Sequence, residues 1–188
     1  MSEEIKGKRV AVMVANEGVE QIEMTAPIEA LKNAGAEVDL IAPEHGEVQA
    51  FNHLDKADTF RVDHSLGEVN SGDYAALVLP GGVANPDQLR TEPKAIKFVT
   101  DFFSEGKPVA AICHAPWTLV EADVVQGRTL TSWPSLKTDI ENAGGTWVDE
   151  EVHVDQGFVT SRKPDDLEAF CSKVVEEIAE GRHAGQTA

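Results

Sequence analysis

Short apolar runs alternate with helical patterns along almost the whole chain, and this alternation restricts the possible fold more than any other feature. The apolar runs that we expect to form buried strands lie at 9–14, 37–42, 74–79 and 109–112. Apolar residues with helical spacing occur at 23–34, at 93–105, from the end of the last strand to about 125, at 134–143 and at 165–180. Strands that are apolar on both faces are typical of a parallel sheet covered on both sides. The pattern therefore predicts an α/β protein with a mostly parallel central sheet and helices on both faces.

The remaining segments are expected to be short strands and connections. We expect a loop at 15–21 and an irregular segment at 44–72, which holds one or two short strands around 48–51 and 60–62. Further short strands are expected at 129–131, 146–148, 152–154 and 158–161. No repeat or linker divides the chain, so we expect one domain over residues 1–188, with a frayed tail after Gly181.

Charge and cysteine content exclude several classes of protein. The 188 residues include 33 acidic and 16 basic side chains, and the net charge of −17 makes nucleic acid an unexpected partner. The first residues lack the apolar core of a signal peptide, and no apolar run is long enough to span a membrane. The two cysteines lie in unlike settings and form no disulfide framework. We therefore expect a cytoplasmic protein without a membrane partner.

The most informative local feature is a cysteine at the end of an apolar run. Cys113 and His114 follow the run 109–112, Pro116 comes next, and a helical pattern follows. This order predicts a strand that turns sharply into a helix, with a thiol at the turn. The helix dipole and free backbone N–H groups there favour the thiolate and can hold an oxyanion. The alternative is a buried structural cysteine, which is how we interpret Cys171 in its apolar helical stripe.

Three segments with chemically reactive or flexible residues are expected to meet at the end of the sheet where the strands have their carboxyl ends. They are the acidic loop that ends in Glu23, the turn after the strand 74–79, and the Cys113-His114 pair. Ligand sites in open parallel sheets lie at the carboxyl ends of the strands. The sequence therefore predicts a functional site where these three segments converge.

Four stretches that contain these segments resemble a known family. They are ANEGVEQIE at 15–23, ALVLPGG at 76–82, GKPVAAICHAP at 106–116 and TSRKPDDL at 160–167. In this order they are similar to the ThiJ/PfpI superfamily, in particular its PfpI-type branch of intracellular cysteine proteases and general stress proteins. The resemblance implies a flavodoxin-like sandwich, of the class I glutamine amidotransferase type. It also implies a homo-oligomer, either a dimer or a hexamer built from dimers.

The resemblance assigns expected roles to the residues of the site. Cys113 is the nucleophile, and His114 is its base, unless only the backbone N–H of His114 acts, beside Gly82, as an oxyanion donor. Glu23 is the buried acid beside the sulfur, with a raised pKa. The alternative role of Glu23 is that of an acid in the first turn of a helix, where the helix dipole stabilises its negative charge. Glu20 is expected to line the mouth, or else to be a solvated loop acid.

A second acid, Asp87, is a candidate for completing the site in an oligomer. PfpI-type enzymes carry a carboxylate after the double glycine that reaches the histidine of a neighbouring subunit. This chain has Asp instead of Glu there, in a segment one residue longer, so an ordinary helix-capping role is the alternative. Gly81 is grouped with Gly82 in the substrate-binding turn.

Other patterns do not extend the site. His153 and Asp155 share a strand face, as in the His-x-acid pair of true glutamine amidotransferases, but the resemblance assigns them no role. The other histidines, His45, His53, His64 and His183, lack metal-ligand spacing. The double glycine is too short for a dinucleotide loop. We therefore expect neither a cofactor nor a bound metal.

Three functions are consistent with a reactive Cys113. The first is detoxification of small reactive carbonyl compounds, as in the glyoxalases and deglycases of this superfamily. The second is an intracellular cysteine peptidase with peptide substrates. The third is a redox or stress sensor that works through oxidation of Cys113. The first is favoured, because a thiolate adds readily to an aldehyde and the expected donors would hold the resulting oxyanion.

Overall fold

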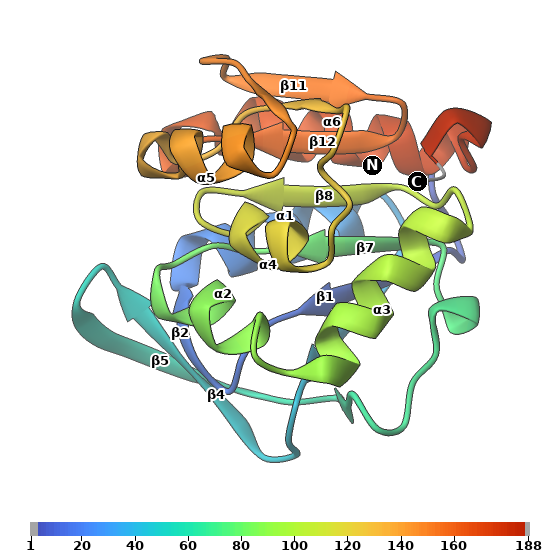
Figure 1. Ribbon diagram of the computed structural model, residues 1–188. Coiled ribbons are helices and arrows are strands. Elements are labelled where there is room, and N and C mark those ends of the chain that lie inside the picture. Colours follow the sequence, from blue (N-terminus) through green and yellow to red (C-terminus); the bar gives the residue numbers. More distant parts are fainter. Residues whose placement is uncertain (1–3, 187–188) are drawn as a thin grey trace.

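The centre of the fold is a seven-stranded sheet, seen in the computed structural model, which describes residues 4–186 (Figure 1). The strands in spatial order are β11 (Val152–Asp155), β12 (Phe158–Ser161), β8 (Val109–Ile112), β7 (Ala76–Leu79), β1 (Arg9–Met13), β3 (Glu37–Ala42) and β6 (His64–Ser65). All neighbours pair in parallel except β11 and β12, which form an antiparallel edge. The predicted α/β class with a mostly parallel sheet is confirmed.

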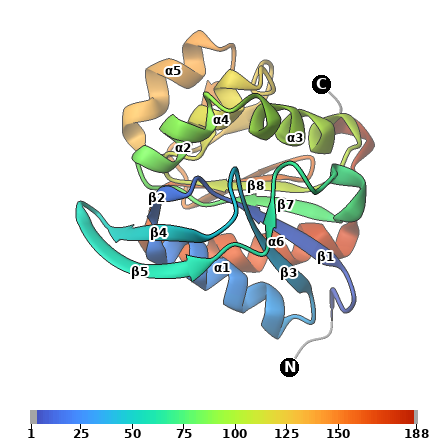
Figure 2. The ribbon, with the colours of Figure 1, turned by 90° about the horizontal axis from the view of Figure 1, so that it is seen from below.

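Helices cover both faces of this sheet (Figure 2). One face carries α1 (Gln21–Asn33) and α6 (Leu167–Glu180). The other face carries α2 (Ala84–Leu89), α3 (Pro93–Ser104), α4 (Pro116–Glu121) and α5 (Lys137–Asn142). None of the helices within residues 4–186 is long and apolar enough to cross a membrane.

Alternate residues of the central strands belong to two separate hydrophobic cores. In β1, Ala11 and Met13 join the core under α3 and α4, whereas Val10 and Val12 join the core under α1 and α6. Side chains of a strand alternate between its two faces, so a strand buried on both faces has to be apolar throughout. This arrangement explains why the inner strands β1, β7 and β8 are continuous apolar runs in the sequence.

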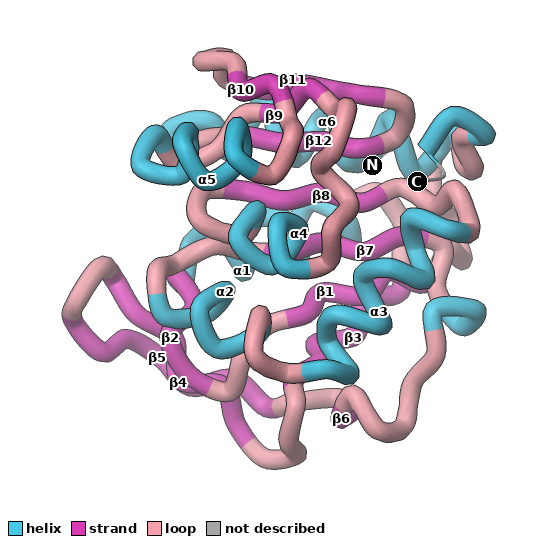
Figure 3. The backbone as a smooth tube through the Cα atoms, in the orientation of Figure 1, coloured by secondary structure: helices cyan, strands magenta, loops and turns pink. Residues whose placement is uncertain are grey.

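A second, three-stranded sheet lies beside the carboxyl ends of the central strands (Figure 3). Its strands are β2 (Glu17–Glu20), β4 (Glu47–Asn52) and β5 (Asp55–Arg61). The expected loop at 15–21 is therefore wrong in part, because Glu17–Glu20 pairs in parallel with β4. The segment 44–72 is also more regular than expected, since β4 and β5 form an antiparallel hairpin whose tip is His53 and Leu54. Strand β2 is short and pairs far along the chain, which leaves little local pattern for its prediction.

Several element boundaries differ from those expected. Helix α4 ends at Glu121 instead of near 125, and Asp123 soon after it has a positive φ of 55°. Helix α5 is shorter because its first turn, Pro134–Leu136, is a 3₁₀ helix. Two short strands, β9 (Thr129–Leu130) and β10 (Thr146–Trp147), form a separate parallel pair. Helix α2 and strand β6 were not expected.

The segment after α6 is packed against the body, so the expectation of a frayed tail after Gly181 is wrong for residues 182–186. The backbone N–H of His183 donates to the Gly106 carbonyl at 2.8 Å. Gln186 is fully buried, and its carbonyl accepts a hydrogen bond from the Arg128 guanidinium. This end of the chain therefore packs against the end of the sheet at which β8 begins.

Candidate active site

Cys113 occupies a sharp turn between β8 and α4. Its φ of +64° lies in the left-handed region, which L-residues other than glycine adopt at an energetic cost. The backbone is held on both sides, because the Cys113 N–H donates to Ser161 O at 3.0 Å and Cys113 O accepts from the Trp133 N–H at 2.8 Å. A strained strand-turn-helix elbow of this kind directs a nucleophile out of the end of the sheet.

The double glycine after β7 brings a second backbone segment close to the sulfur. A Cβ atom at Gly81 would lie 2.4 Å from Glu23 Oε2 and 2.6 Å from Cys113 Cβ, so no larger residue fits without displacement. Gly82 has a φ of +85°, and a Cβ there would lie 2.4 Å from Gly18 O. Glycine is therefore required at both positions by close approach and, at Gly82, also by conformation.

A buried amide fixes this turn against the end of β1. Asn85 is fully buried, and its Nδ2 donates to Pro80 O at 2.8 Å and to Gly81 O at 3.0 Å. Its Oδ1 accepts from the Ala15 N–H at 2.6 Å. Asn85 is thus a positioning residue of the site. The sequence analysis missed it because a single Asn in a polar loop carries no local signal.

Glu23 lies in the first turn of α1, with its carboxyl group packed against Gly81 and the Cys113 thiol. The residue is fully buried, and neither carboxyl oxygen has a conventional hydrogen-bond partner among the described residues. Burial, and to a smaller extent the nearby Glu20 charge, raises the pKa of Glu23 to about 8. The carboxyl group is therefore mainly protonated at neutral pH and can donate a proton to the sulfur or to a bound oxygen.

The thiol itself rests in its protonated form. Burial raises the pKa of Cys113 above its usual range. The backbone N–H groups of Gly82 and His114 act in the opposite direction. The sequence analysis expected the helix dipole and the free backbone N–H groups to favour the thiolate. The two N–H groups act in that direction, but burial outweighs them. Helix α4 has only six residues, and Cys113 is 7% exposed, so loss of hydration outweighs the dipole.

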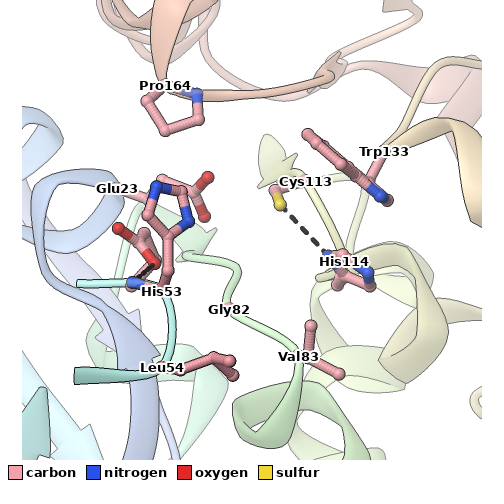
Figure 4. Close-up of a pocket in the computed structure, with 10 residues that line it drawn as sticks. Glu23, His53, Leu54, Gly82, Val83, Cys113, His114, Trp133 and Pro164 are labelled. Atoms are coloured by element: carbon pink, nitrogen blue, oxygen red, sulfur yellow. Dashed lines mark hydrogen bonds between the residues drawn. The ribbon is translucent and has the colours of Figure 1, made fainter. Parts of the chain in front are cut away.

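His114 supplies a proton acceptor next to that thiol. Its Nδ1 lies 3.2 Å from Cys113 Sγ (Figure 4). The imidazole stacks on the Trp133 ring, with centroids 5.7 Å apart and planes inclined by 21°. Burial lowers the pKa of His114 to about 4, so the ring is neutral at pH 7, and in the tautomer with the proton on Nε2 its Nδ1 accepts a hydrogen bond from the thiol. Both the side chain and the backbone N–H of His114 thus reach the sulfur.

These groups open into a pocket of about 290 Å³. Its lining residues come from both sheets and are Glu20, Glu23, His53, Leu54, Gly82, Val83, Cys113, His114, Trp133 and Pro164 (Figure 4). Glu20 is 9% exposed and accepts the His53 backbone N–H at 2.9 Å, so it lines the mouth and also holds the hairpin tip. His53 and Leu54 were missed as site residues, because the pairing of β4 with the distant strand β2 and the bond to Glu20 bring them here.

Other candidate residues lie outside this pocket. Asp87 is exposed on α2 and is not among the pocket-lining residues of this chain. His153 Nδ1 faces Glu150 at 2.7 Å on the outer strand β11. Cys171 is half-buried against the core under α1 and α6, as its apolar stripe predicted. The structure therefore brings together Cys113, His114, Glu23, Glu20, Gly81 and Gly82, but not Asp87.

The comparison with known proteins identifies the family of this chain. Residues 8–177 match the DJ-1/PfpI family. The chain belongs to the DJ-1/PfpI family. Deglycase PH1704 of Pyrococcus horikoshii is 42% identical over 167 residues, which cover 89% of this chain and 97% of that protein. General stress protein 18 of Bacillus subtilis is 42% identical over 165 residues, which cover 87% and 94% of the two chains.

Solved structures agree with this DJ-1/PfpI assignment. Drosophila melanogaster DJ-1beta superposes with a TM-score of 0.84 at 30% identity, over 92% of this chain and 91% of that one. The expected resemblance to the PfpI type and the expected fold are both confirmed. With a deglycase and a general stress protein among its relatives, the chain is an enzyme of the stress-response PfpI type.

Replacement of Gly81 by alanine is expected to destabilise the protein. The added Cβ would overlap the Glu23 carboxyl group and Cys113, and overpacking of this kind typically costs about 1–3 kcal/mol. Urea unfolding should show this loss for Gly81→Ala. Gly72→Ala is the matched control, because a Cβ there meets nothing within 4 Å, and its stability should change by less than about 0.5 kcal/mol. Equal stability of the two variants would contradict the close approach.

The raised pKa of Glu23 should make stability depend on pH. The pKa is about 8 in the fold and ordinarily 4.5, so between these values the folded state holds a proton that the unfolded state has lost. Stability should therefore fall as pH rises through this window, by at most about 1.4 kcal/mol per pH unit. Below pH 6.5, His114, with its pKa lowered to about 4, opposes this trend, because there the unfolded state binds a proton that the folded state lacks.

The effect of Glu23 alone should thus appear between pH 6.5 and 8. Urea unfolding of the wild type should show stability falling across this interval, relative to Glu23→Gln measured under the same conditions. All other titrating groups are common to both proteins, so the difference between the two curves isolates Glu23. Parallel curves would show that the carboxyl group is already ionised at pH 6.5.

Proposed function

We propose that this DJ-1/PfpI protein detoxifies reactive carbonyl compounds, with small 2-oxoaldehydes as substrates and Cys113 as the nucleophile. The observation that carries the proposal is the set of groups around one sulfur. His114 Nδ1 lies 3.2 Å from the sulfur and can accept the thiol proton, protonated Glu23 can donate one, and the N–H groups of Gly82 and His114 approach the sulfur. Addition of a thiol to an aldehyde needs these functions together.

The first step is addition of the sulfur to the aldehyde. His114 Nδ1 takes the thiol proton while the sulfur forms a bond to the aldehyde carbon, and the electron pair of the C=O bond moves to the oxygen. The N–H groups of Gly82 and His114 stabilise this oxyanion. A proton from Glu23 or from the His114 imidazolium then neutralises it, which gives a hemithioacetal.

The second step moves hydrogen between neighbouring carbons. Loss of the proton from the hemithioacetal carbon and its return to the adjacent carbonyl carbon, through an enediol, converts the adduct into a thioester of a 2-hydroxy acid. Water then hydrolyses the thioester and restores the thiol. For methylglyoxal the sum is one oxoaldehyde plus one water to one lactate, with no external oxidant or reductant.

The shape of the pocket supports a small substrate. A volume of about 290 Å³ is at the lower end of the range for small-molecule sites and holds one compact molecule or one side chain. The name of the relative Deglycase PH1704 also agrees with carbonyl chemistry. An extended peptide would need a longer groove, so the small carbonyl substrate is favoured over the peptidase alternative.

Methylglyoxal consumption with lactate detection tests this function. Wild-type protein should form lactate, and Cys113→Ser should lose activity by about a thousandfold or more, because the weaker hydroxyl nucleophile replaces the thiol. Cys171→Ser is the matched control and should keep activity, since that thiol lies away from the pocket. Equal lactate formation by wild type and Cys113→Ser, or none by either, would overturn the proposal.

We also propose that a second copy of the chain covers the mouth of the pocket. Four large apolar side chains are unusually exposed in the described chain, and three of them line the pocket. They are Leu54 (94% exposed), Val83 (57%), Ile22 (45%) and Trp133 (38%). Exposed apolar residues gathered at one place favour a protein interface. In such a homo-oligomer, Asp87 of the neighbouring subunit would approach His114 and complete a Cys-His-acid triad.

Asp87→Asn tests this arrangement through the pH profile. A partner carboxylate should raise the pKa of His114, so the variant should lose kcat/KM about tenfold and its acidic limb should move to lower pH. Sedimentation should show the same oligomer for the variant and the wild type. A monomeric wild type, or an unchanged profile for Asp87→Asn, would reduce Asp87 to an ordinary helix residue.

A further inference from the structure

We propose that Glu177, Glu180 and His183 form a structural site for one divalent metal ion of the zinc type. One ligand atom from each residue can be chosen so that all three lie within 4.8 Å of one another. The site is independent of the carbonyl chemistry proposed above. The site lies at the opposite end of the strands from the pocket, because His183 contacts Gly106, which precedes β8, whereas Cys113 follows β8.

The geometry of the helix end brings the three side chains together. Glu177 and Glu180 are three residues apart in the last turn of α6, so their side chains lie on the same helix face. Gly181 follows with a φ of +93° and ends the helix. The hydrogen bond from the His183 N–H to Gly106 O, at 2.8 Å, then fixes the returning chain. The sequence showed no ligand spacing for His183, because this turn brings it back to the helix.

Two of the proposed ligand groups, the half-buried His183 imidazole and the buried Glu177 carboxyl group, form an ion pair that lacks hydrogen-bond geometry. His183 Nε2 is inaccessible to solvent and has no hydrogen-bond partner among the described residues. It lies 3.1 Å from Glu177 Oε2, whose side chain is only 9% exposed. A buried imidazole nitrogen and a buried carboxylate need compensation, and a shared metal ion would satisfy both lone pairs. A plain His⁺–Glu⁻ ion pair is the competing interpretation.

A further unpartnered group lies against the same imidazole. Gln186 is fully buried, and neither its Oε1 nor its Nε2 has a partner among the described residues. A Cβ placed on Gly157 would lie 2.5 Å from His183 Cδ2 and 2.7 Å from Gln186 Oε1. The amide oxygen and the imidazole ring therefore both lie next to Gly157. A buried amide without a partner thus lies beside the imidazole that we propose as a ligand.

The donor set indicates the class of metal. One imidazole nitrogen with two carboxylates suits zinc and neighbouring transition ions, whereas magnesium and calcium prefer sites made of oxygen alone. Bound metal would join the end of α6 to the returning chain and, through Gly106, to the start of β8. Its role is thus to fix the end of the fold, without contact with the reacting atoms.

Zinc binding to the full chain tests this site. Because thiols also bind zinc, the measurements use untagged protein with Cys113→Ser and Cys171→Ser, freed of metal by a chelator. Calorimetry should show one zinc per chain, and zinc at a hundredfold excess over Kd should raise Tm by about 5 °C or more. Magnesium should produce no comparable rise. Anomalous scattering at the zinc edge should place the ion between His183 and Glu177.

Matched variants separate this site from a simple ion pair. Glu180→Gln changes an exposed side chain and should keep the metal-free Tm, but it should lower zinc affinity at least tenfold. His183→Ala should abolish the Tm rise. Glu176→Gln, an exposed acid of the same helix paired with Lys173, should leave zinc binding unchanged. Zinc binding that is absent in the parent, or equal in the parent and all three variants, would overturn the proposal.

Discussion

The close approach of Glu23, Gly81 and Cys113 is the constraint on which the rest of the site depends. Three segments from the ends of different strands meet with no space for one additional carbon atom. Because the meeting point is buried, the carboxyl group keeps its proton and the thiol keeps its own. Asn85 and the backbone bonds of Cys113 hold these segments in place, so the strain of the elbow is compensated by ordinary hydrogen bonds nearby.

Burial gives this site a resting state different from that of a free thiolate. With a neutral His114, a protonated Glu23 and a protonated thiol, the cluster carries little charge and is stable in a poorly hydrated pocket. In the proposed reaction, charge develops only when a substrate supplies an oxygen that can accept it. The N–H groups of Gly82 and His114 are directed at the sulfur, next to the atom to which the substrate carbon would bond.

The sequence predicted the parts of the fold that depend on local patterns. The inner strands β1, β7 and β8 were recognised because burial on both faces requires continuous apolar runs, and the elbow was recognised because Cys113 directly follows one of them. Strand β2, the position of the β4–β5 hairpin against it and the returning chain at His183 depend on contacts between distant parts of the sequence, which leave no local pattern. The effect of burial on the pKa of Cys113 was not predicted either, since burial is a property of the folded chain.

The two sheets contribute different parts of the pocket. The central sheet and its turns carry the reacting atoms, whereas the tip of the β4–β5 hairpin, with His53 and the 94% exposed Leu54, forms one wall of the opening. A two-residue tip can change in size and polarity without moving Cys113, because its attachment to Glu20 uses a backbone N–H. Substrate choice can therefore diverge among proteins of this architecture while the chemistry at the sulfur stays constant.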